Sequence, residues 1–312
     1  TTKYEKRSIA LEIPIWDEGI CIDCARCALV CPHAAIRIKY YDPKVLENAP
    51  AGFPSREPKG KEFPGMLLTV QVAPEDCTGC GVCVSICPAK SKEEVKHKAI
   101  NMEPKDPHLE KERERYDFFL TIPEADRSLV NPSSLKGSQA LLPLFEYSGA
   151  CAGCGETPYV KLASQLFGDR MIIGNATGCS SIYGGNLPTT PWTTNAAGKG
   201  PAWSNSLFED AAEFAFGMRL AADQKAVAAQ AAIKALAGIL GDDLVKAAVE
   251  ADQTTEQGIE EQRARVAAIR EKLAKVDSPE ARWALGLLDA LVRKSVWAMG
   301  GDGWAYDIGF GG

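Results

Sequence analysis

The chain has 312 residues, of which 46% are hydrophobic and 24% charged, and its net charge is −6. These proportions are typical of a globular protein with room for two domains. The acidic balance and the lack of a basic stretch argue against a nucleic-acid or membrane-surface protein. Residues 1–7 lead into no apolar segment, and the most apolar stretch, residues 226–240, is too short to cross a bilayer. We therefore expect no signal peptide, no membrane segment and no nucleic-acid partner.

Eight of the eleven cysteines form one pattern twice. Three cysteines follow one another at two-residue gaps, and a fourth comes after three residues and precedes a proline. The first run is Cys21, Cys24, Cys27 and Cys31, and the second is Cys77, Cys80, Cys83 and Cys87. This spacing is typical of two-cluster bacterial ferredoxins, in which the last cysteine of each run ligates the other run's cluster. The expected ligand sets of the two [4Fe–4S] clusters are Cys21, Cys24, Cys27 and Cys87, and Cys77, Cys80, Cys83 and Cys31.

Structural zinc and disulfides are the alternative uses of these cysteines. Zinc ribbons use pairs rather than runs of four, and closely spaced cysteines in a relaxed loop rarely suit disulfide geometry. Cluster thiolates need a reducing, low-oxygen compartment, so we expect the cytoplasm. His33, His97 and His108 show no ligand spacing, and we expect all three on the surface.

The cysteine runs lie in an internal repeat of strand, cluster loop, short helix and strand. Residues 13–16 and 68–72 are the expected strands before each run. We therefore predict an α+β ferredoxin-like domain over residues 1–118. Charge and proline dominate from residue 103 onward, which predicts a linker over the surface that occupies residues 119–139.

Residues 140–312 form the predicted second domain. A helix over 159–167 precedes a buried strand at 171–173, and residues 182–205 have the composition of a loop. Later helices, with starts near residues 255 and 278, carry no evident chemistry and are interpreted as an added helical layer. A last strand, 295–299, runs into Gly301-Asp302-Gly303, where small residues let a phosphate or metal approach a carboxylate. Two strands cannot make a parallel sheet, so we expect the rest of the sheet beyond Gly312 or on another chain.

Three cysteines remain outside the two runs. Cys151 and Cys154 lie in one glycine-rich loop, and Cys179 follows a strand in another. They are one thiolate short of a cubane set. A redox pair with a bystander cysteine is the alternative.

The motifs of the second domain make the chain resemble an internal segment of pyruvate:ferredoxin (flavodoxin) oxidoreductase, a multidomain 2-oxoacid oxidoreductase that uses thiamine diphosphate. The matching motifs are residues 149–159, 175–181 and 301–309. The resemblance implies a ferredoxin-like domain followed by the first part of an α/β thiamine-diphosphate-binding domain with a helical insertion.

The resemblance also implies the roles of individual residues. Cys151, Cys154 and Cys179 would ligate a third [4Fe–4S] cluster, completed by a cysteine outside the segment, and Asp302 would ligate the Mg²⁺ of the diphosphate. The implied cofactor contacts are Gly155, Glu156, Thr177, Gly178, Cys179, Ser180, Ser181, Gly301, Asp302, Gly303 and Trp304. No catalytic residue is assigned, because the activating glutamate of this family belongs to another domain.

The implied activity is oxidative decarboxylation of pyruvate with coenzyme A to acetyl-CoA and CO2. Electrons would pass from thiamine diphosphate through three clusters to ferredoxin or flavodoxin, in a homodimer that includes the remaining domains. The segment alone is expected to be inactive. The alternatives are a standalone polyferredoxin, an enzyme for another 2-oxoacid, and a zinc-stapled scaffold.

Overall fold

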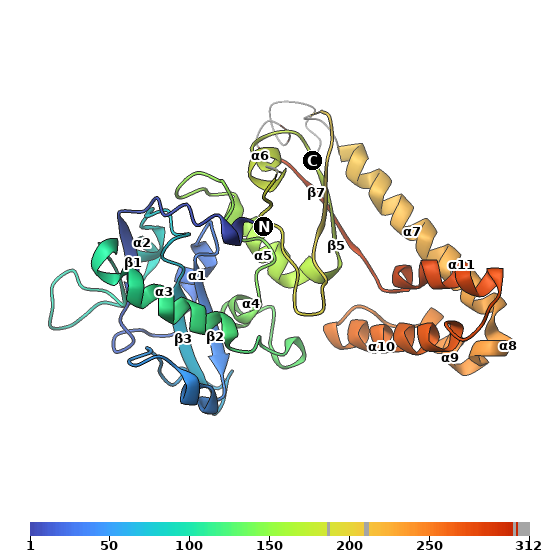
Figure 1. The fold of residues 1–312 in the computed structure, drawn as a ribbon, viewed down its shortest axis with the longest axis horizontal. Coiled ribbons are helices and arrows are strands. Elements are labelled where there is room, and N and C mark those ends of the chain that lie inside the picture. The colour runs from blue at the N-terminus through green and yellow to red at the C-terminus, as the bar shows by residue number, and fades with distance from the viewer. Residues whose placement is uncertain (186–187, 209–211, 302–303, 305–312) are drawn as a thin grey trace. The chain divides into compact units, whose positions relative to one another are not determined.

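The computed structural model describes residues 1–185, 188–208, 212–301 and 304, and the chain divides into two compact units (Figure 1). Thr1–Asp169 and Gly178–Pro201 form the first, here called the cysteine unit. Arg170–Thr177 and Ala202–Gly312 form the second, here called the sheet unit. This division by compactness does not follow the predicted domain boundaries at residues 118 and 139, which stay predictions.

The cysteine unit begins with the expected repeat. Strand β1 (Glu12–Trp16), helix α1 (Arg26–Val30) and strand β2 (Ile36–Tyr41) form its first half. Strand β3 (Leu67–Val72), helix α2 (Val82–Ile86) and strand β4 (Ile100–Pro104) form its second half. The halves exchange partners, because β1 pairs antiparallel with β4 and β2 pairs antiparallel with β3. Both short helices begin after a residue with positive φ, Ala25 at 58° and Gly81 at 70°, which turns each cysteine loop back into its helix.

The charge-rich segment that begins near residue 103 is helical in its first part. Helix α3 (Lys105–Thr121) reaches the first residues of the predicted linker and packs on β3, with Phe119 only 1% exposed. Ion pairs three residues apart, such as Glu112 with Arg115 at 2.7 Å, support the helix. Tyr116 and Phe119 have the spacing of a buried stripe, and the charged residues around them hide it in the sequence.

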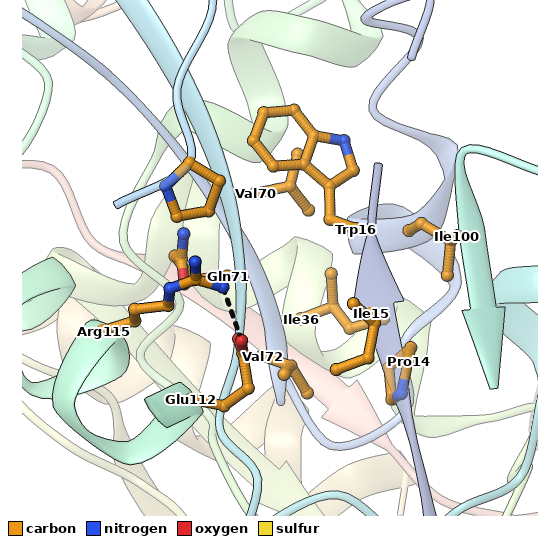
Figure 2. Close-up of a pocket in the computed structure, with 11 residues that line it drawn as sticks. Pro14, Ile15, Trp16, Ile36, Val70, Gln71, Val72, Ile100, Glu112 and Arg115 are labelled. Carbon is orange, nitrogen blue, oxygen red and sulfur yellow. Dashed lines mark hydrogen bonds and ion pairs between the residues drawn. The ribbon is translucent and has the colours of Figure 1, made fainter. Parts of the chain in front are cut away.

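Figure 2 shows the Glu112–Arg115 pair at one side of a small pocket beneath α3. Trp16, Val70 and Ile100 line the pocket from β1, β3 and β4. The two antiparallel sheets therefore share one apolar core.

The rest of the cysteine unit packs against this core. Its helices are α4 (Leu135–Ala140), α5 (Thr157–Phe167) and α6 (Cys179–Gly185). A buried ion pair between Arg37 of β2 and Glu146, together with a 2.5 Å bond between the Tyr116 and Tyr147 hydroxyls, fixes the segment before Cys151. Single 3-10 turns occur at Thr2–Tyr4, Pro43–Asn48, Arg127–Leu129 and Gly168–Arg170.

One histidine departs from its predicted surface position. His33 is 2% exposed, and its Nδ1 lies 3.2 Å from the carbonyl oxygen of Ser148. It is buried because the chain that follows Cys31-Pro32 turns under the segment before Cys151. His97 and His108 are partly exposed and pair with carboxylates, as a surface position predicts.

The sheet unit contains a parallel sheet in the order β6-β5-β7. Its strands are β5 (Met171–Asn175), β6 (Ala202–Asn205) and β7 (Ser295–Met299). The sequence prediction missed β6, which lies in the presumed loop 182–205 and has mostly exposed residues and only four positions. The expectation that a parallel sheet cannot form within the chain is therefore wrong. At Gly174 of β5 a Cβ would come within 2.8 Å of Ala215, so the first helix of the unit lies directly on the strand.

A helical layer lies between β6 and β7 in the sequence, as predicted. The helices are α7 (Ala212–Ala235), α8 (Ala237–Leu240), α9 (Asp242–Val249), α10 (Glu256–Leu273) and α11 (Pro279–Leu287), with a 3-10 turn at Leu288–Leu291. Thr255 and Ser278 cap α10 and α11 by accepting bonds from backbone N–H groups. The helices enclose their own apolar core, which includes Ile233, Ile269 and Leu273. In the described part of the chain, none of the helices combines the length and the apolar character that a bilayer span requires.

Candidate iron–sulfur centres

The first cysteine set draws on both halves of the repeat. Cys21, Cys24 and Cys27 line a cavity together with Cys87. Its apolar wall includes Trp16, Val70 and Ile100, the residues that Figure 2 shows between the sheets. Cys87 reaches this cavity because β4, the strand after it, pairs with β1, the strand before Cys21.

The second cysteine set combines three cysteines of the second run with Cys31 of the first run. The Cys31 thiol acts electrostatically on both Cys77 and Cys83, and all three side chains are buried. Helices α1 and α2 pack together, and Cys83 of the second set helps to raise the pKa of Cys27 of the first. The two sets are therefore neighbours.

Burial controls the chemistry of these thiols. It raises the pKa of Cys77 to about 12 and raises the pKa of Cys27 and Cys83 as well. A cysteine in such a place is no nucleophile at neutral pH, since the thiolate is the reactive form. A bound cationic iron–sulfur core would stabilise the thiolates that burial disfavours.

Both runs supply the same backbone hydrogen bond to sulfur. The N–H of Asp23 lies 3.4 Å from Cys21 Sγ, and the N–H of Gly79 lies 3.4 Å from Cys77 Sγ. Such bonds help to set the potentials of iron–sulfur clusters. The donor set, its burial and these N–H groups all fit a [4Fe–4S] cluster.

The third set lies within the same unit. A tight turn joins Cys151 to Cys154, with the Cys154 N–H 3.1 Å from the Cys151 carbonyl oxygen. Gly153 in this turn has a φ of +74°, and a Cβ there would lie 3.7 Å from Cys80 Cβ. The loop of the third set therefore touches the loop of the second run.

A buried tyrosine joins the two loops that carry the third set. Tyr183 of α6, the helix that opens with Cys179, donates to Glu156 Oε1 at 2.6 Å. Burial and the Glu156 bond raise the pKa of this phenol, and Cys154 and Cys179 act on it from nearby. Cys151 and Cys179 are exposed, which leaves room for a fourth ligand from elsewhere.

The predicted cofactor contacts fall into two groups. Gly155, Glu156, Gly178, Cys179, Ser180 and Ser181 belong to the cysteine unit. Thr177, Gly301 and Trp304 belong to the sheet unit. Asp302 and Gly303 lie outside the described residues, so the Mg²⁺ ligand stays a prediction.

Two polar residues near the sites were missed by the sequence analysis. Asp23, in the gap between Cys21 and Cys24, is buried and accepts from the Tyr40 hydroxyl and Lys136 Nζ, both at 2.7 Å. Its position inside a cysteine run was an available signal. Lys161 of α5 is also buried, and the sequence gives no sign of this, because α5 reads as an ordinary amphipathic helix.

Comparison with known proteins agrees with this geometry. A family model described as a 4Fe-4S dicluster domain matches residues 20–91. This part of the chain is therefore a ferredoxin-like iron–sulfur domain with two cysteine runs.

The whole chain has relatives of high identity. It is 56% identical over 316 residues to a pyruvate-flavodoxin oxidoreductase of Trichormus variabilis, covering 100% of this chain and 27% of the relative. It is 54% identical over 312 residues to a probable pyruvate-flavodoxin oxidoreductase of Escherichia coli, covering 100% of this chain and 26% of the relative. A pyruvate:ferredoxin oxidoreductase of Moorella thermoacetica is 48% identical over 328 residues, and the match covers 100% of this chain and 27% of the relative. The chain thus corresponds to a segment of the pyruvate-flavodoxin oxidoreductases, as its motifs predict, and spans about a quarter of their length.

Proposed function

We propose that this chain is the electron-transfer segment, and part of the thiamine-diphosphate site, of an enzyme that oxidises pyruvate with coenzyme A to acetyl-CoA and CO2. The chain's sequence identity of 54% and 56% to pyruvate-flavodoxin oxidoreductases, over its full length, supports pyruvate as the substrate. The observation that carries the electron-transfer role is the sharing of cysteines between the two runs, with Cys87 in the cavity of the first run.

Two [4Fe–4S] clusters are proposed on the eight cysteines of the runs. Cys21, Cys24, Cys27 and Cys87 would hold the first, and Cys77, Cys80, Cys83 and Cys31 the second. A bound cluster supplies one-electron reduction and oxidation without proton transfer at the protein. The chain excludes water with the apolar wall around Trp16 and Val70, and donates N–H groups to Cys21 and Cys77.

A third [4Fe–4S] cluster is proposed on Cys151, Cys154 and Cys179, with a ligand from outside this segment. The contact of Gly153 with Cys80 places this set beside the second run, and the packing of α1 on α2 places the second set beside the first. The three sets are thus contiguous, which is the arrangement that stepwise electron transfer needs.

Thiamine diphosphate and Mg²⁺ are proposed from the resemblance. Asp302 would ligate the metal, and the loops around Glu156, Cys179 and Gly301 would contact the cofactor. When bound there, thiamine diphosphate would supply the nucleophilic carbon and the electron sink that decarboxylation of a 2-oxoacid requires. We further propose that flavodoxin or ferredoxin accepts the electrons, that the whole enzyme is a homodimer, and that it works in the cytoplasm.

The test is reduction of the clusters by substrate in the anaerobically purified full-length enzyme. Pyruvate with coenzyme A should bleach the cluster absorbance and release CO2, and Cys179→Ser should abolish this bleaching while dithionite still reduces the variant. If dithionite but not pyruvate reduces the wild-type clusters, the protein is an electron carrier rather than a 2-oxoacid oxidoreductase. If another 2-oxoacid replaces pyruvate, the mechanism stands and the substrate is wrong.

A further inference from the structure

Lys161 is a buried lysine that contacts α1, the short helix of the first cysteine run. It is 2% exposed and belongs to α5. Its Nζ donates to the carbonyl oxygen of Leu29 at 3.0 Å and also to that of Ala28. Both carbonyls belong to α1, which contains Cys27 and leads directly into Cys31. The ammonium group therefore lies between a ligand of the proposed first cluster and a ligand of the proposed second.

The charge of Lys161 has no protein counter-charge in the described part of the chain. Its two neighbouring buried cations are each paired, Arg37 with Glu146 and Lys39 with Glu124 at 2.7 Å. No such ion pair joins Lys161 to a carboxylate among the residues described. Carbonyl dipoles alone compensate poorly for a buried ammonium, because a charge removed from water loses its hydration.

The groups that act on Lys161 identify the missing partner. Burial lowers its pKa to about 8, Cys31 and Cys27 oppose that fall, and Arg37 adds to it. The lysine is therefore mostly protonated at neutral pH. The anions that can balance the Lys161 ammonium are the thiolates of Cys27 and Cys31, together with the clusters proposed on them.

We infer that Lys161 is the buried counter-charge of both iron–sulfur clusters and raises their reduction potentials. The inference rests on the proposed ligand sets of Cys27 and Cys31. Four thiolates give each cluster a net negative charge, and reduction adds one more electron. A fixed cation in a low-dielectric site favours the more negative state, so the clusters accept electrons more readily with Lys161 than without it. Lys161 acts here as a positioning residue, since it contacts the carbonyls of α1 rather than a cluster ligand.

The test is a redox titration of the full-length enzyme with dithionite and mediators, followed by EPR. Lys161→Met keeps the length of the side chain and removes its charge. We expect the equilibrium constant for one-electron reduction to fall at least tenfold, a shift of about 59 mV to lower potential. Lys161→Arg should keep potentials near those of the wild type. Lys39→Met is the matched control, because it also removes a buried lysine, but one that is paired with Glu124; its shift should be much smaller.

Each outcome decides the inference. Unchanged potentials in a fully loaded Lys161→Met enzyme would overturn it, and so would an equal shift in Lys39→Met. If Lys161→Met and Lys161→Gln both lose iron while Lys161→Arg retains it, the charge is needed for assembly and the inference stands. Loss of iron in all three variants would show that packing alone matters. None of these readouts uses pyruvate, so a failure of the proposed reaction is recognised separately.

Discussion

Cys87, the last cysteine of the second run, lines the same cavity as Cys24 of the first run. The exchange follows from strand pairing. Trp16, at the end of β1, lies opposite Ile100, at the start of β4, so the two chain segments that flank the cavity are hydrogen-bonded to each other. Because the corresponding strands β2 and β3 also pair, Cys31 is brought to the second run. Each cysteine set therefore includes one cysteine of the other run, as the proposed crossed ligation requires.

Removing one of the exchanged cysteines should damage the opposite cluster. We expect Cys87→Ser to lose the first cluster and retain the second, whereas Cys31→Ser should do the reverse. Iron and sulfide analysis with Mössbauer or EPR spectra of the full-length enzyme would distinguish them. Loss of the second cluster in Cys87→Ser would show that each run ligates its own cluster.

Trp16 should tune the first cluster alone. Its buried Nε1 has no hydrogen-bond partner among the described residues, and Trp16 lines the cavity of the first set. Burial raises the pKa of the Cys21 thiol, and the nearby Trp16 indole opposes that rise. Trp16→Phe should lower the potential of the first cluster and leave the second unchanged, in contrast to the effect on both clusters expected for Lys161→Met. A redox titration that showed no shift would mean that the indole only packs.

Phe119 should be essential to the stability of the cysteine unit, although it lies in the segment with the composition of a linker. Truncating a buried aromatic residue costs about 3–5 kcal/mol. Phe119→Ala should therefore lower the urea concentration at which the cluster absorbance disappears. Leu120→Ala, at a neighbouring position that is 51% exposed, is the matched control and should have little effect. Equal midpoints for the two variants would contradict the packing of α3.

The pair of His97 and Asp17 should respond to pH. Nε2 of His97 lies 2.8 Å from Asp17 Oδ2, and this hydrogen bond raises the pKa of His97 above its ordinary value. A raised pKa in the folded state means that the pair stabilises the fold fully below about pH 6.5, the unfolded value. That stabilisation disappears as the pH rises through the folded pKa.

The effect is small because the pair is at the surface. NMR of labelled histidine should show that Asp17→Asn lowers the pKa of His97. His108, which pairs with Glu103 instead, serves as the internal control. If the substitution left the titration of His97 unchanged, Asp17 would not be its partner in solution.

The cysteine spacing and the strand patterns predicted the first half of the fold well. Each run fixes a loop and a short helix, and the apolar residues around 13–16 and 68–72 give strands where expected. The exchange of Cys31 and Cys87 was predicted from the same spacing, and the strand pairing supplies a physical reason for it.

Other features depend on tertiary contacts that local sequence does not encode. The charges around Tyr116 and Phe119 obscure α3, whose burial depends on the sheet beneath it. Strand β6 is short and mostly exposed, and only its pairing with β5 defines it. The burial of His33 and Lys161 arises from segments distant in sequence, Ser148 for the histidine and α1 for the lysine.

The most direct test of the central claim is the content of iron, acid-labile sulfide and zinc in the anaerobically purified full-length enzyme and its Cys151→Ser variant. Three [4Fe–4S] clusters predict about twelve irons and twelve sulfides for each copy of this segment, and about eight of each in the variant. Equal amounts of iron in the two proteins would mean that Cys151 holds no cluster. Zinc without sulfide would contradict electron transfer through this chain altogether.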